Sequence, residues 1–380
     1  MKKVFSVFVC VLFLAPVFCA RSTAAVYEKD PDCRSAVLID MSTMTVLYEK
    51  NADTPYPPAS VTKIMTLLLT CEAIDSGRVS LSDKVPVSEN AAKMGGSQVY
   101  LKVGEDMTLE DMLKSVVVSS ANDCAVALAE YISGSESSFV SEMNRKADEL
   151  GMKNTHFENV TGLDDTAKNH VTSARDIAIM SAELMKHEMI FKYTTIWMDT
   201  IRNGSFGLTN TNRLIRYYNG ANGLKTGMTA KAGFCISAAA KRSGMQLIAV
   251  IMGAPSRDIR NAAASDLLDF GFANYGLYSV SKADLQPVKL KGGDIDYVNV
   301  CHESFSALLP SSDIRSVSYE TKLPEYITAP VKSGDVIGSI EFFCNGKPIG
   351  ETDITVSEDA ERIGFSGILK KLFYKFLMIR

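Results

Sequence analysis

Apolar and polar residues follow two different periodicities over residues 27–277, one typical of strands and the other of helices. The predicted strands are 35–40, 45–48, 233–240 and 246–252. The predicted helices are about 60–77, 109–132, 136–150, 173–188 and 258–270. Since strands stand at both ends of this region and helices lie between them, we expect one α+β domain whose sheet joins the first and the later strands.

The pattern changes near residue 280. Beyond about Ser281, short apolar segments alternate with Gly and Pro turns, as at 328–335 and 344–347. This pattern predicts a small all-β domain over 279–360, preceded by the α+β domain at 26–278.

The last residues, 361–380, have the spacing of an amphipathic helix. Its apolar stripe comprises Phe365, Ile368, Leu369, Leu372, Phe373, Phe376 and Ile379, and the basic residues Lys370, Lys371, Lys375 and Arg380 lie outside it. The helix is too short to span a bilayer, so we expect residues 364–380 to lie on an anionic membrane surface. The alternative is a helix packed on the protein's own core.

The first 25 residues have the three-part layout of a secretory signal peptide. Lys2 and Lys3 precede an apolar run from Val4 to about Val17, and small residues follow at 22–25. We therefore expect an exported protein, with attachment to the outer face of the cytoplasmic membrane through the final helix. A retained membrane anchor is the alternative, although the apolar run is short for a span.

Composition places the chain among ordinary globular proteins. Hydrophobic residues make up 46% and charged residues 22% of its 380 residues, which argues against disorder and against fibrous structures. The formal net charge is −4, and no long Lys/Arg run is present. Because binding to duplex nucleic acid needs a basic footprint, we expect no nucleic-acid partner.

Cysteines and histidines carry no metal pattern in this sequence. Export would leave Cys33, Cys71, Cys124, Cys235, Cys301 and Cys344, which are scattered singly in apolar stretches. We expect these six residues to be buried free thiols. Neither they nor the four histidines have the spacing of a ligand set, so no metal or cofactor is predicted.

The first chemical motif is Ser60-Val61-Thr62-Lys63, which follows two prolines and begins a predicted helix. The spacing i, i+3 places the Lys63 amine on the same helix face as the Ser60 hydroxyl. A serine becomes an effective nucleophile when a base removes its proton, and a lysine can do so when burial and neighbours lower its pKa. Alone, the motif is most often structural.

The second motif is Ser120-Ala121-Asn122, at the start of a further helix. The hydroxyl of Ser120 can relay a proton to a leaving amine, and the amide of Asn122 can hold both a substrate carbonyl and a lysine. On its own the motif could equally be a helix N-cap.

The third motif is Lys225-Thr226-Gly227, followed by Met228, just before the strand through Phe234. A lysine and a hydroxyl at a strand edge can bind a carboxylate. Gly227 would allow a second backbone to approach closely enough to pair as an added strand.

In this order, the three motifs resemble the Ser-x-x-Lys, Ser-x-Asn and Lys-Thr-Gly set of penicillin-binding proteins and class A β-lactamases. More closely, the chain resembles the D-Ala-D-Ala carboxypeptidases among the low-molecular-mass penicillin-binding proteins. The resemblance covers nearly the whole chain and includes the segments 58–66, 95–97, 154–157, 161–163, 172–176 and 223–229. It implies a penicillin-binding, serine β-lactamase-like domain in which helices pack on an antiparallel sheet.

The resemblance also implies an activity, which is removal of the terminal D-alanine from peptidoglycan stem peptides, with β-lactam antibiotics as inhibitors. The implied catalytic residues are Ser60, Lys63, Ser120, Asn122 and Lys225, and the implied substrate-binding residues are Lys225, Thr226, Gly227, Met228 and Arg260. In this scheme Ser60 forms the acyl-enzyme, Lys63 is its base, and the backbone N–H groups of Ser60 and Met228 bind the oxyanion.

Two positions depart from the family pattern. Ala121 stands where Gly is frequent, which is a small change, and Arg213 is placed differently from the arginine of some relatives, so we assign it no role. Two other classes of function remain as alternatives. A β-lactamase would need a deacylating carboxylate, yet no Glu-x-x-Leu-Asn segment lies between the second and third motifs. A catalytically silent wall-binding protein would not need all three motifs intact.

Overall fold

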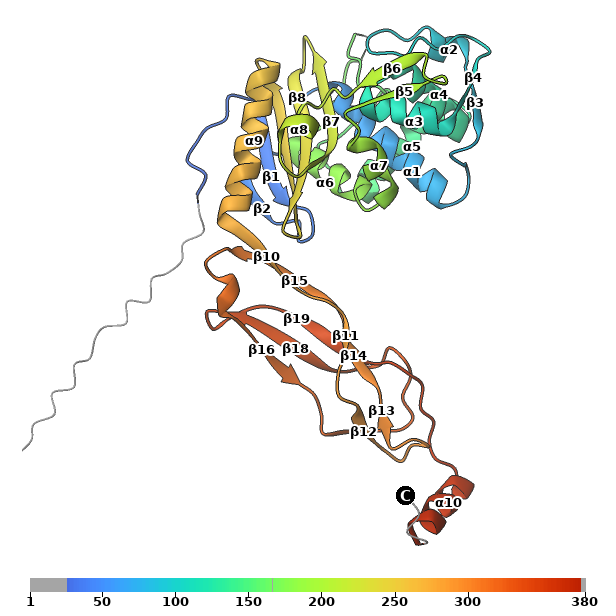
Figure 1. Cartoon of the computed structure of the whole chain (residues 1–380), viewed down its shortest axis with the longest axis vertical. Coiled ribbons are helices and arrows are strands. Elements are labelled where there is room, and N and C mark those ends of the chain that lie inside the picture. The colour runs from blue at the N-terminus through green and yellow to red at the C-terminus, as the bar shows by residue number, and fades with distance from the viewer. Residues whose placement is uncertain (1–25, 166, 377–380) are drawn as a thin grey trace, which may run out of the picture.

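The computed structural model describes residues 26–165 and 167–376, so the predicted signal peptide lies outside the described residues. A five-stranded antiparallel sheet with the order β2-β1-β9-β8-β7 forms the centre of the α+β domain, which extends from β1 to α9 (Figure 1). Its strands are β1 (Ser35–Asp40), β2 (Val46–Lys50), β7 (Ala221–Thr229), β8 (Gly233–Arg242) and β9 (Met245–Ala254). The first strand pairs with β9, which confirms the predicted sheet of first and later strands.

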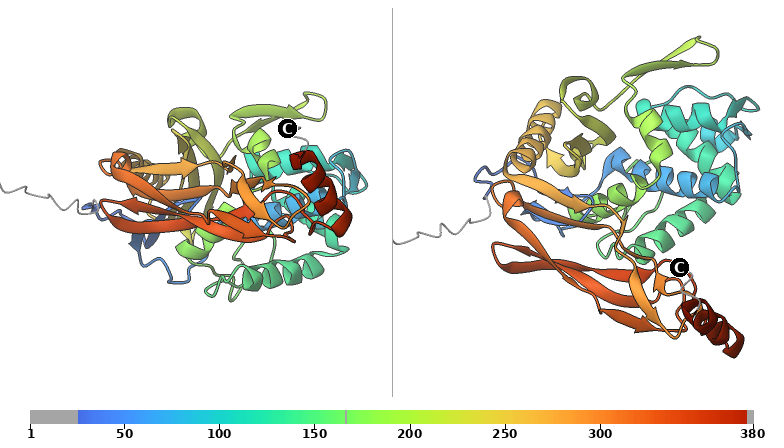
Figure 2. Two further views of the ribbon diagram at one scale, coloured as in Figure 1. Left: turned by 90° about the horizontal axis from the view of Figure 1, so that it is seen from below. Right: turned by 60° about the horizontal axis from the view of Figure 1, so that its bottom comes forward.

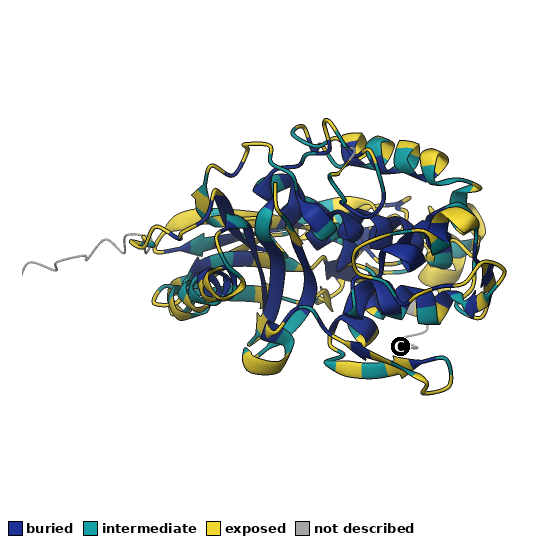
Figure 3. Ribbon diagram, turned by 90° about the horizontal axis from the view of Figure 1, so that it is seen from above, coloured by how far each residue is buried: buried dark blue, intermediate teal, exposed yellow. Residues whose placement is uncertain are grey.

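Both faces of this sheet are buried, because consecutive residues of a strand point to opposite faces. Ala36 and Leu38 of β1 pack toward α9 (Arg257–Asn274), whereas Val37 and Ile39 pack toward the other helices. In Figure 3 the inner strands β1, β8 and β9 are accordingly buried along most of their length, whereas β2 at one edge has no buried residue. This arrangement explains why the strand sequences are continuous apolar runs and do not alternate.

The helices on the other side of the sheet position the first two motifs. They are α1 (Lys63–Asp75), α2 (Glu89–Ala92), α3 (Leu109–Val118), α4 (Asn122–Ser133), α5 (Glu136–Glu149), α6 (Ala174–Leu184), α7 (Phe191–Thr194) and α8 (Leu214–Tyr217). The helical pattern at 109–132 is divided at the second motif, where the sequence predicted the start of a further helix, and Ser120, with a positive φ of 62°, separates α3 from α4. The helix expected from Ser60 begins at Lys63, after the 3₁₀ turn η1 (Ala59–Thr62).

Short strand pairs and a 3₁₀ turn complete the α+β domain, and the sequence pattern did not predict them. They are the pair β3 (Lys84–Pro86) and β4 (Asp106–Thr108), the hairpin β5 (Met198–Ile201) and β6 (Phe206–Thr209), and η2 (Glu188–Ile190). The third motif, expected just before a strand, lies within β7 itself, at the edge of the main sheet.

The remainder of the chain forms the predicted β domain, from β10 to β19. Its strands are β10 (Tyr275–Val280), β11 (Ala283–Asp284), β12 (Val288–Lys291), β13 (Tyr297–Val298), β14 (Val300–His302), β15 (Phe305–Pro310), β16 (Val317–Lys322), β17 (Tyr326–Thr328), β18 (Val336–Cys344) and β19 (Lys347–Val356), with a 3₁₀ turn η3 (Ile314–Ser316). A separate apolar core, which includes Val300, Phe342 and Ile354, holds its sheets together. The β domain therefore has a core of its own.

Helix α10 (Phe365–Phe376) follows the β domain and projects from its end, remote from the α+β domain (Figures 1 and 2). Lys371 ties it to the β domain through Asp296 at 2.7 Å and the carbonyl of Gly293 at 3.2 Å. Phe365 and Phe376 are more than four-fifths exposed, so most of the apolar stripe has no cover within the described chain. No helix among residues 26–165 and 167–376 is long and apolar enough to cross a bilayer.

The six cysteines of the described chain are buried free thiols, as expected. Burial raises the pKa of Cys71 to about 12 and that of Cys235 to about 11, which keeps both thiols protonated and unreactive at neutral pH.

Candidate active site

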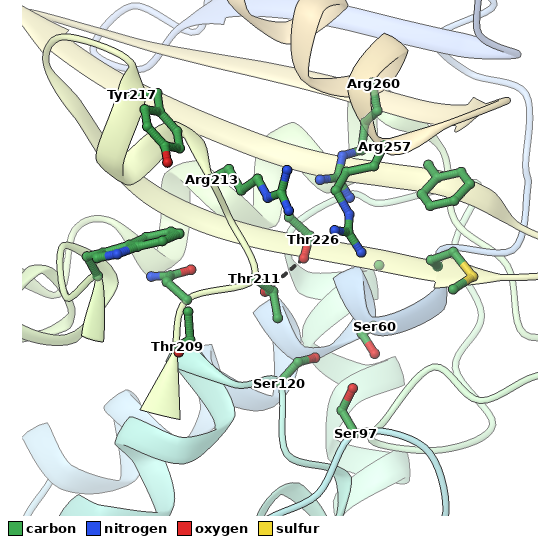
Figure 4. Close-up of a pocket in the computed structure, with 15 residues that line it drawn as sticks. Ser60, Ser97, Ser120, Thr209, Thr211, Arg213, Tyr217, Thr226, Arg257 and Arg260 are labelled. Atoms are coloured by element: carbon green, nitrogen blue, oxygen red, sulfur yellow. Dashed lines mark hydrogen bonds between the residues drawn. The ribbon is translucent and has the colours of Figure 1, made fainter. Parts of the chain in front are cut away.

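The three predicted motifs meet at one pocket of about 580 Å³, between the β7 edge of the sheet and the helices that face it (Figure 4). Its lining residues are Ser60, Ser97, Ser120, Trp197, Thr209, Asn210, Thr211, Arg213, Tyr217, Thr226, Gly227, Met228, Phe234, Arg257 and Arg260. Segments separated by more than a hundred residues thus contribute to a single site.

Ser60 lies half-buried in η1, where the backbone is pressed against β7. A Cβ atom on Gly227 would lie 2.8 Å from both the Pro58 carbonyl oxygen and the Ser60 nitrogen. Because real Cβ atoms do not approach so closely, Gly227 is what allows β7 to reach the serine. We predicted that Gly227 would allow a second backbone to approach closely. One such backbone is the chain's own, at Pro58 and Ser60.

Lys63 is fully buried, and its Nζ lies 2.9 Å from Ser60 Oγ. The amine donates to Asn122 Oδ1 at 2.6 Å and to the Thr161 carbonyl at 3.0 Å. Burial lowers the pKa of Lys63 well below its usual value, and the positive charge of Lys225 adds to this effect. In the neutral amine, two N–H groups have these two acceptors, so the lone pair is left to face the Ser60 hydroxyl.

Lys225, from β7, is hydrogen-bonded to the second serine, Ser120, as Lys63 is to Ser60. Its Nζ donates to Ser120 Oγ at 2.7 Å and to the Thr226 carbonyl at 3.0 Å. Burial lowers the pKa of Lys225 to about 7, and the nearby guanidinium of Arg260 contributes. At neutral pH this amine exchanges protons readily, so it can hold the Ser120 hydroxyl in place or support a proton relay through it.

Asn122 links the first two motifs, as its amide was expected to do. Its Oδ1 accepts from Lys63, while its Nδ2 donates to the Gly95 carbonyl at 2.7 Å. The next residue, Asp123, is buried, and its carboxylate accepts from the backbone N–H groups of Val99 and Leu101. The loop that carries Ser97 is therefore fastened to the start of α4.

The predicted substrate-binding residues lie beside the two serines. The Thr226 hydroxyl donates to Thr211 Oγ1 at 2.8 Å, and Arg260 is buried behind it on α9 (Figure 4). Met228 lies one residue beyond Gly227 on β7, with its side chain 58% exposed at the pocket mouth. All nine predicted site residues thus lie at or near the same pocket: six line it, and Lys63 and Lys225 are hydrogen-bonded to serines that line it.

Several residues hold the site together although the sequence analysis assigned them no role, and of these only Thr161 and Gly162 lie in a segment that carries the resemblance. Thr161 contributes a backbone carbonyl to Lys63. Only glycine fits at position 162, because a Cβ atom there would lie 1.8 Å from the Ala59 carbonyl oxygen. His170 is also buried against the first motif, with its Nε2 2.7 Å from Thr62 Oγ1. Their contacts with the first motif depend on the fold and leave no local pattern in the sequence, since these residues lie about a hundred positions from the motif that they support.

Arg213 and Arg257 also line the pocket, although the sequence analysis assigned neither of them a role. Their guanidinium groups point toward Thr226 in Figure 4, on the same side as Arg260. No group of three His, Cys, Asp or Glu side chains within the described residues is placed to hold a metal ion.

Two family models match the chain. A model described as D-alanyl-D-alanine carboxypeptidase matches residues 22–256, and one described as the C-terminal domain of penicillin-binding protein 5 matches residues 276–362. Together they cover both domains of the structure.

Individual relatives agree with these models. The chain is 42% identical over 366 residues to D-alanyl-D-alanine carboxypeptidase DacF of Bacillus subtilis, with 94% of each chain covered. Penicillin-binding protein 5 from Haemophilus influenzae superposes with a TM-score of 0.76 at 30% identity, over 89% of this chain and all of the other. Penicillin-binding protein D2 from Listeria monocytogenes, solved in its ampicillin-bound form, superposes with a TM-score of 0.60 at 29% identity over 65% of this chain and all of the other.

Proposed function

The chain belongs to the D-alanyl-D-alanine carboxypeptidase family of serine-type peptidases, and from this premise we propose how its own residues carry the reaction. Ser60 attacks the peptide bond between the last two D-alanines of a peptidoglycan stem pentapeptide and forms an acyl-enzyme. The observation that carries this assignment is the 2.9 Å contact between Ser60 Oγ and the buried, low-pKa amine of Lys63.

Substrate binding uses the open edge of β7. The extended peptide pairs with the strand beside Met228, and its terminal carboxylate is bound by the Thr226 hydroxyl and by Arg260. Because β7 is the last strand of the sheet, its outer edge pairs with no other strand of the sheet, and a peptide can add there. The scissile carbonyl then lies over Ser60, within reach of the N–H groups of Ser60 and Met228.

Acylation begins when neutral Lys63 takes the proton of the Ser60 hydroxyl and Ser60 Oγ bonds to the carbonyl carbon. The two backbone N–H groups stabilise the negative charge on the carbonyl oxygen. When the carbon–nitrogen bond breaks, the leaving nitrogen receives, through Ser120, the proton that Lys63 removed. D-alanine departs, and the remaining peptide is esterified to Ser60.

Deacylation returns the enzyme to its starting state. A water molecule gives a proton to Lys63 while its oxygen bonds to the ester carbon. The carbon–oxygen bond to the enzyme then breaks, and Ser60 Oγ regains the proton from Lys63. The products are the shortened peptide acid and the free serine hydroxyl.

A β-lactam presents a strained amide and a carboxylate in a comparable arrangement, so we expect penicillins to acylate Ser60. The ampicillin-bound form of the Listeria relative supports this expectation. No Asp or Glu side chain lines the pocket among the described residues, which disfavours the carboxylate-assisted deacylation of a class A β-lactamase.

We also propose that the protein is exported and held at the outer face of the cytoplasmic membrane by residues 364–380. The exposed apolar stripe of α10 and the basic residues beside it support this location. The helix lies at the end of the molecule remote from the α+β domain, so membrane contact there leaves the pocket accessible.

The decisive experiment is incubation of the purified mature protein with a pentapeptide ending in D-Ala-D-Ala, followed by an assay for free D-alanine. We expect release by the wild-type protein and none by Ser60→Ala. A penicillin adduct on another residue, found by mass spectrometry, or full activity of Ser60→Ala, would contradict the assignment.

A further inference from the structure

The pocket extends well past the two catalytic serines, on the side where the terminal carboxylate is proposed to bind. Beyond Thr226 it continues past Arg213 to Tyr217 (Figure 4), whose ring lies edge-on to that of Trp197 in the same lining. Its volume of about 580 Å³ is in the range of pockets that enclose ligands much larger than one alanine. This volume includes the space around the two serines, and the methyl side chain of a leaving D-alanine would not reach the part lined by Trp197 and Tyr217.

Three guanidinium groups converge on this part of the pocket, from Arg213, Arg257 and Arg260. Arg260 donates to Asn261 Oδ1 at 2.8 Å and to the Cys235 carbonyl at 3.4 Å. None of the three forms a salt bridge within the described residues. Among the described residues, the charge of Asp258 acts on Arg260, but no carboxylate pairs directly with any of the three guanidinium groups.

The arginines also affect one another. Burial, together with the charges of Arg257 and Arg213, lowers the pKa of Arg260 to about 10, and the carboxylate of Asp258 only partly opposes this effect. Bringing like charges together is unfavourable, and a bound anion relieves the repulsion. The terminal carboxylate of the substrate has two oxygens, for which the Thr226 hydroxyl and one bidentate guanidinium suffice. Two guanidinium groups then remain for a second anionic group.

We propose that this pocket is a subsite for a leaving residue that carries a second carboxylate on its side chain, and that Arg213 and Arg257 determine this preference. The inference rests on the proposed function, since it assigns the leaving group to this side of Ser60. The reaction is unchanged: the same carbon–nitrogen bond breaks, and a dicarboxylic D-amino acid leaves with the proton supplied through Ser120. The methylene groups of its side chain would lie against the aromatic wall formed by Trp197 and Tyr217.

The test compares three acylated peptides that end in D-Ala-D-Ala, D-Ala-D-Glu and D-Ala-D-Gln. D-Glu and D-Gln have nearly the same size and differ in charge, so the ratio of their kcat/KM values isolates recognition of the second carboxylate. We expect the wild-type protein to prefer D-Glu over D-Gln by about tenfold or more, because hydrogen bonds to charged groups are strong. The preference should weaken as salt concentration rises.

Arg213→Gln and Arg257→Gln should each reduce the D-Glu to D-Gln ratio by at least about threefold. Arg145→Gln, which removes an exposed arginine that pairs with Glu149 on α5, is the matched control and should keep the ratio. An equal loss on all three peptides would assign the arginines to the terminal carboxylate alone and would overturn the proposal.

The outcomes also separate this inference from the proposed function. Failure to release D-alanine from the D-Ala-D-Ala peptide would overturn both. Release of D-alanine together with a wild-type D-Glu to D-Gln ratio near one would overturn the subsite and leave the carboxypeptidase assignment standing.

Discussion

Lys63 Nζ donates to the backbone carbonyl of Thr161 at 3.0 Å, although 98 residues separate them in the chain. The Thr161 backbone is itself held by Asn159, whose Oδ1 accepts from the N–H of Gly162 at 2.7 Å. A backbone carbonyl in a fastened loop cannot turn away, so it fixes the direction of the amine that it binds. The geometry is matched to a small amine with one lone pair directed at Ser60.

Lys63→Arg should therefore abolish most of the acylation by penicillin. A guanidinium remains protonated at neutral pH and cannot accept the Ser60 proton, so we expect a loss of about 10²–10⁴-fold. The rate of labelling by a fluorescent penicillin measures the effect. Lys93→Arg, at an exposed lysine that pairs with Glu89, is the control and should label normally. Labelling of Lys63→Arg at a rate near that of the wild type would remove lysine from the role of base.

Gly227→Ala should displace β7 from the η1 turn, because its Cβ would meet backbone atoms of Pro58 and Ser60 at 2.8 Å. A shift of about 1 Å in the oxyanion-binding groups is enough to cost on the order of 100-fold in acylation. Gly207→Ala is a matched control, since nothing lies within 4 Å of the added Cβ. Equal acylation rates for the two variants would show that the close approach is unimportant for catalysis.

The stability of the folded protein should depend on His170 at mildly acidic pH. Its Nδ1 accepts from the Glu158 N–H at 3.0 Å, so the neutral ring carries its proton on Nε2 and donates to Thr62. Burial lowers its pKa to about 4, against about 6.5 in the unfolded chain, and the charge of Glu158 only partly opposes this.

Since the unfolded chain binds this proton more readily, the contribution of neutral His170 is fully present above pH 6.5. It is lost as the pH falls from 6.5 to about 4, by roughly 3 kcal/mol in all. Urea unfolding of the wild type and of His170→Gln at several pH values checks this. We expect the free energy of unfolding of the wild type, relative to that of His170→Gln, to fall by roughly 3 kcal/mol between pH 6.5 and about 4. A difference that stays constant over this pH range would contradict the titration of His170.

The apolar stripe of α10 should be necessary for vesicle binding and dispensable for catalysis. Replacing Phe365, Leu369 and Phe373 by Ser removes three large exposed side chains, each worth roughly 1.5–3 kcal/mol if fully buried in lipid. We expect binding to anionic liposomes to fall at least about tenfold in co-sedimentation, with peptide hydrolysis retained.

Tyr319→Ser, in the β domain, is a control for this experiment because Tyr319 is exposed to a similar degree as Phe373, 64% against 62%. Deletion of residues 364–380 should reproduce the effect of the triple substitution. Unchanged binding of either variant, or loss of peptide hydrolysis on deletion, would show that the helix serves the fold.

The sequence predicted the α+β domain, the β domain and the residues of the three motifs, because periodicity and short motifs are local properties. It did not predict local backbone conformations that depend on contacts with residues distant in the chain. The second motif indicated a helix start near Ser120, but not the φ of 62° at that residue, with which its side chain meets Lys225. Such conformations concentrate at functional sites and have no local signature.

The contributions of Thr161, His170 and Arg257 were likewise outside the reach of the sequence. Thr161 acts through a backbone carbonyl, which every residue has, so its identity carries no signal. His170 and Arg257 reach the site only because a loop and a helix start are packed against η1 and β7 in the folded domain. Residues of this kind become visible when tertiary contacts are known.

The β domain separates α10 from the α+β domain along the longest axis of the molecule (Figure 1). With α10 resting on a bilayer, the domain would act as a stalk of fixed length, and the catalytic serine would work at one height above the lipid. Stem peptides in the layer of wall at that height would be trimmed first, and those lying flat against the membrane or far beyond it would escape. The stalk would thus select among chemically identical substrates by their distance from the membrane alone.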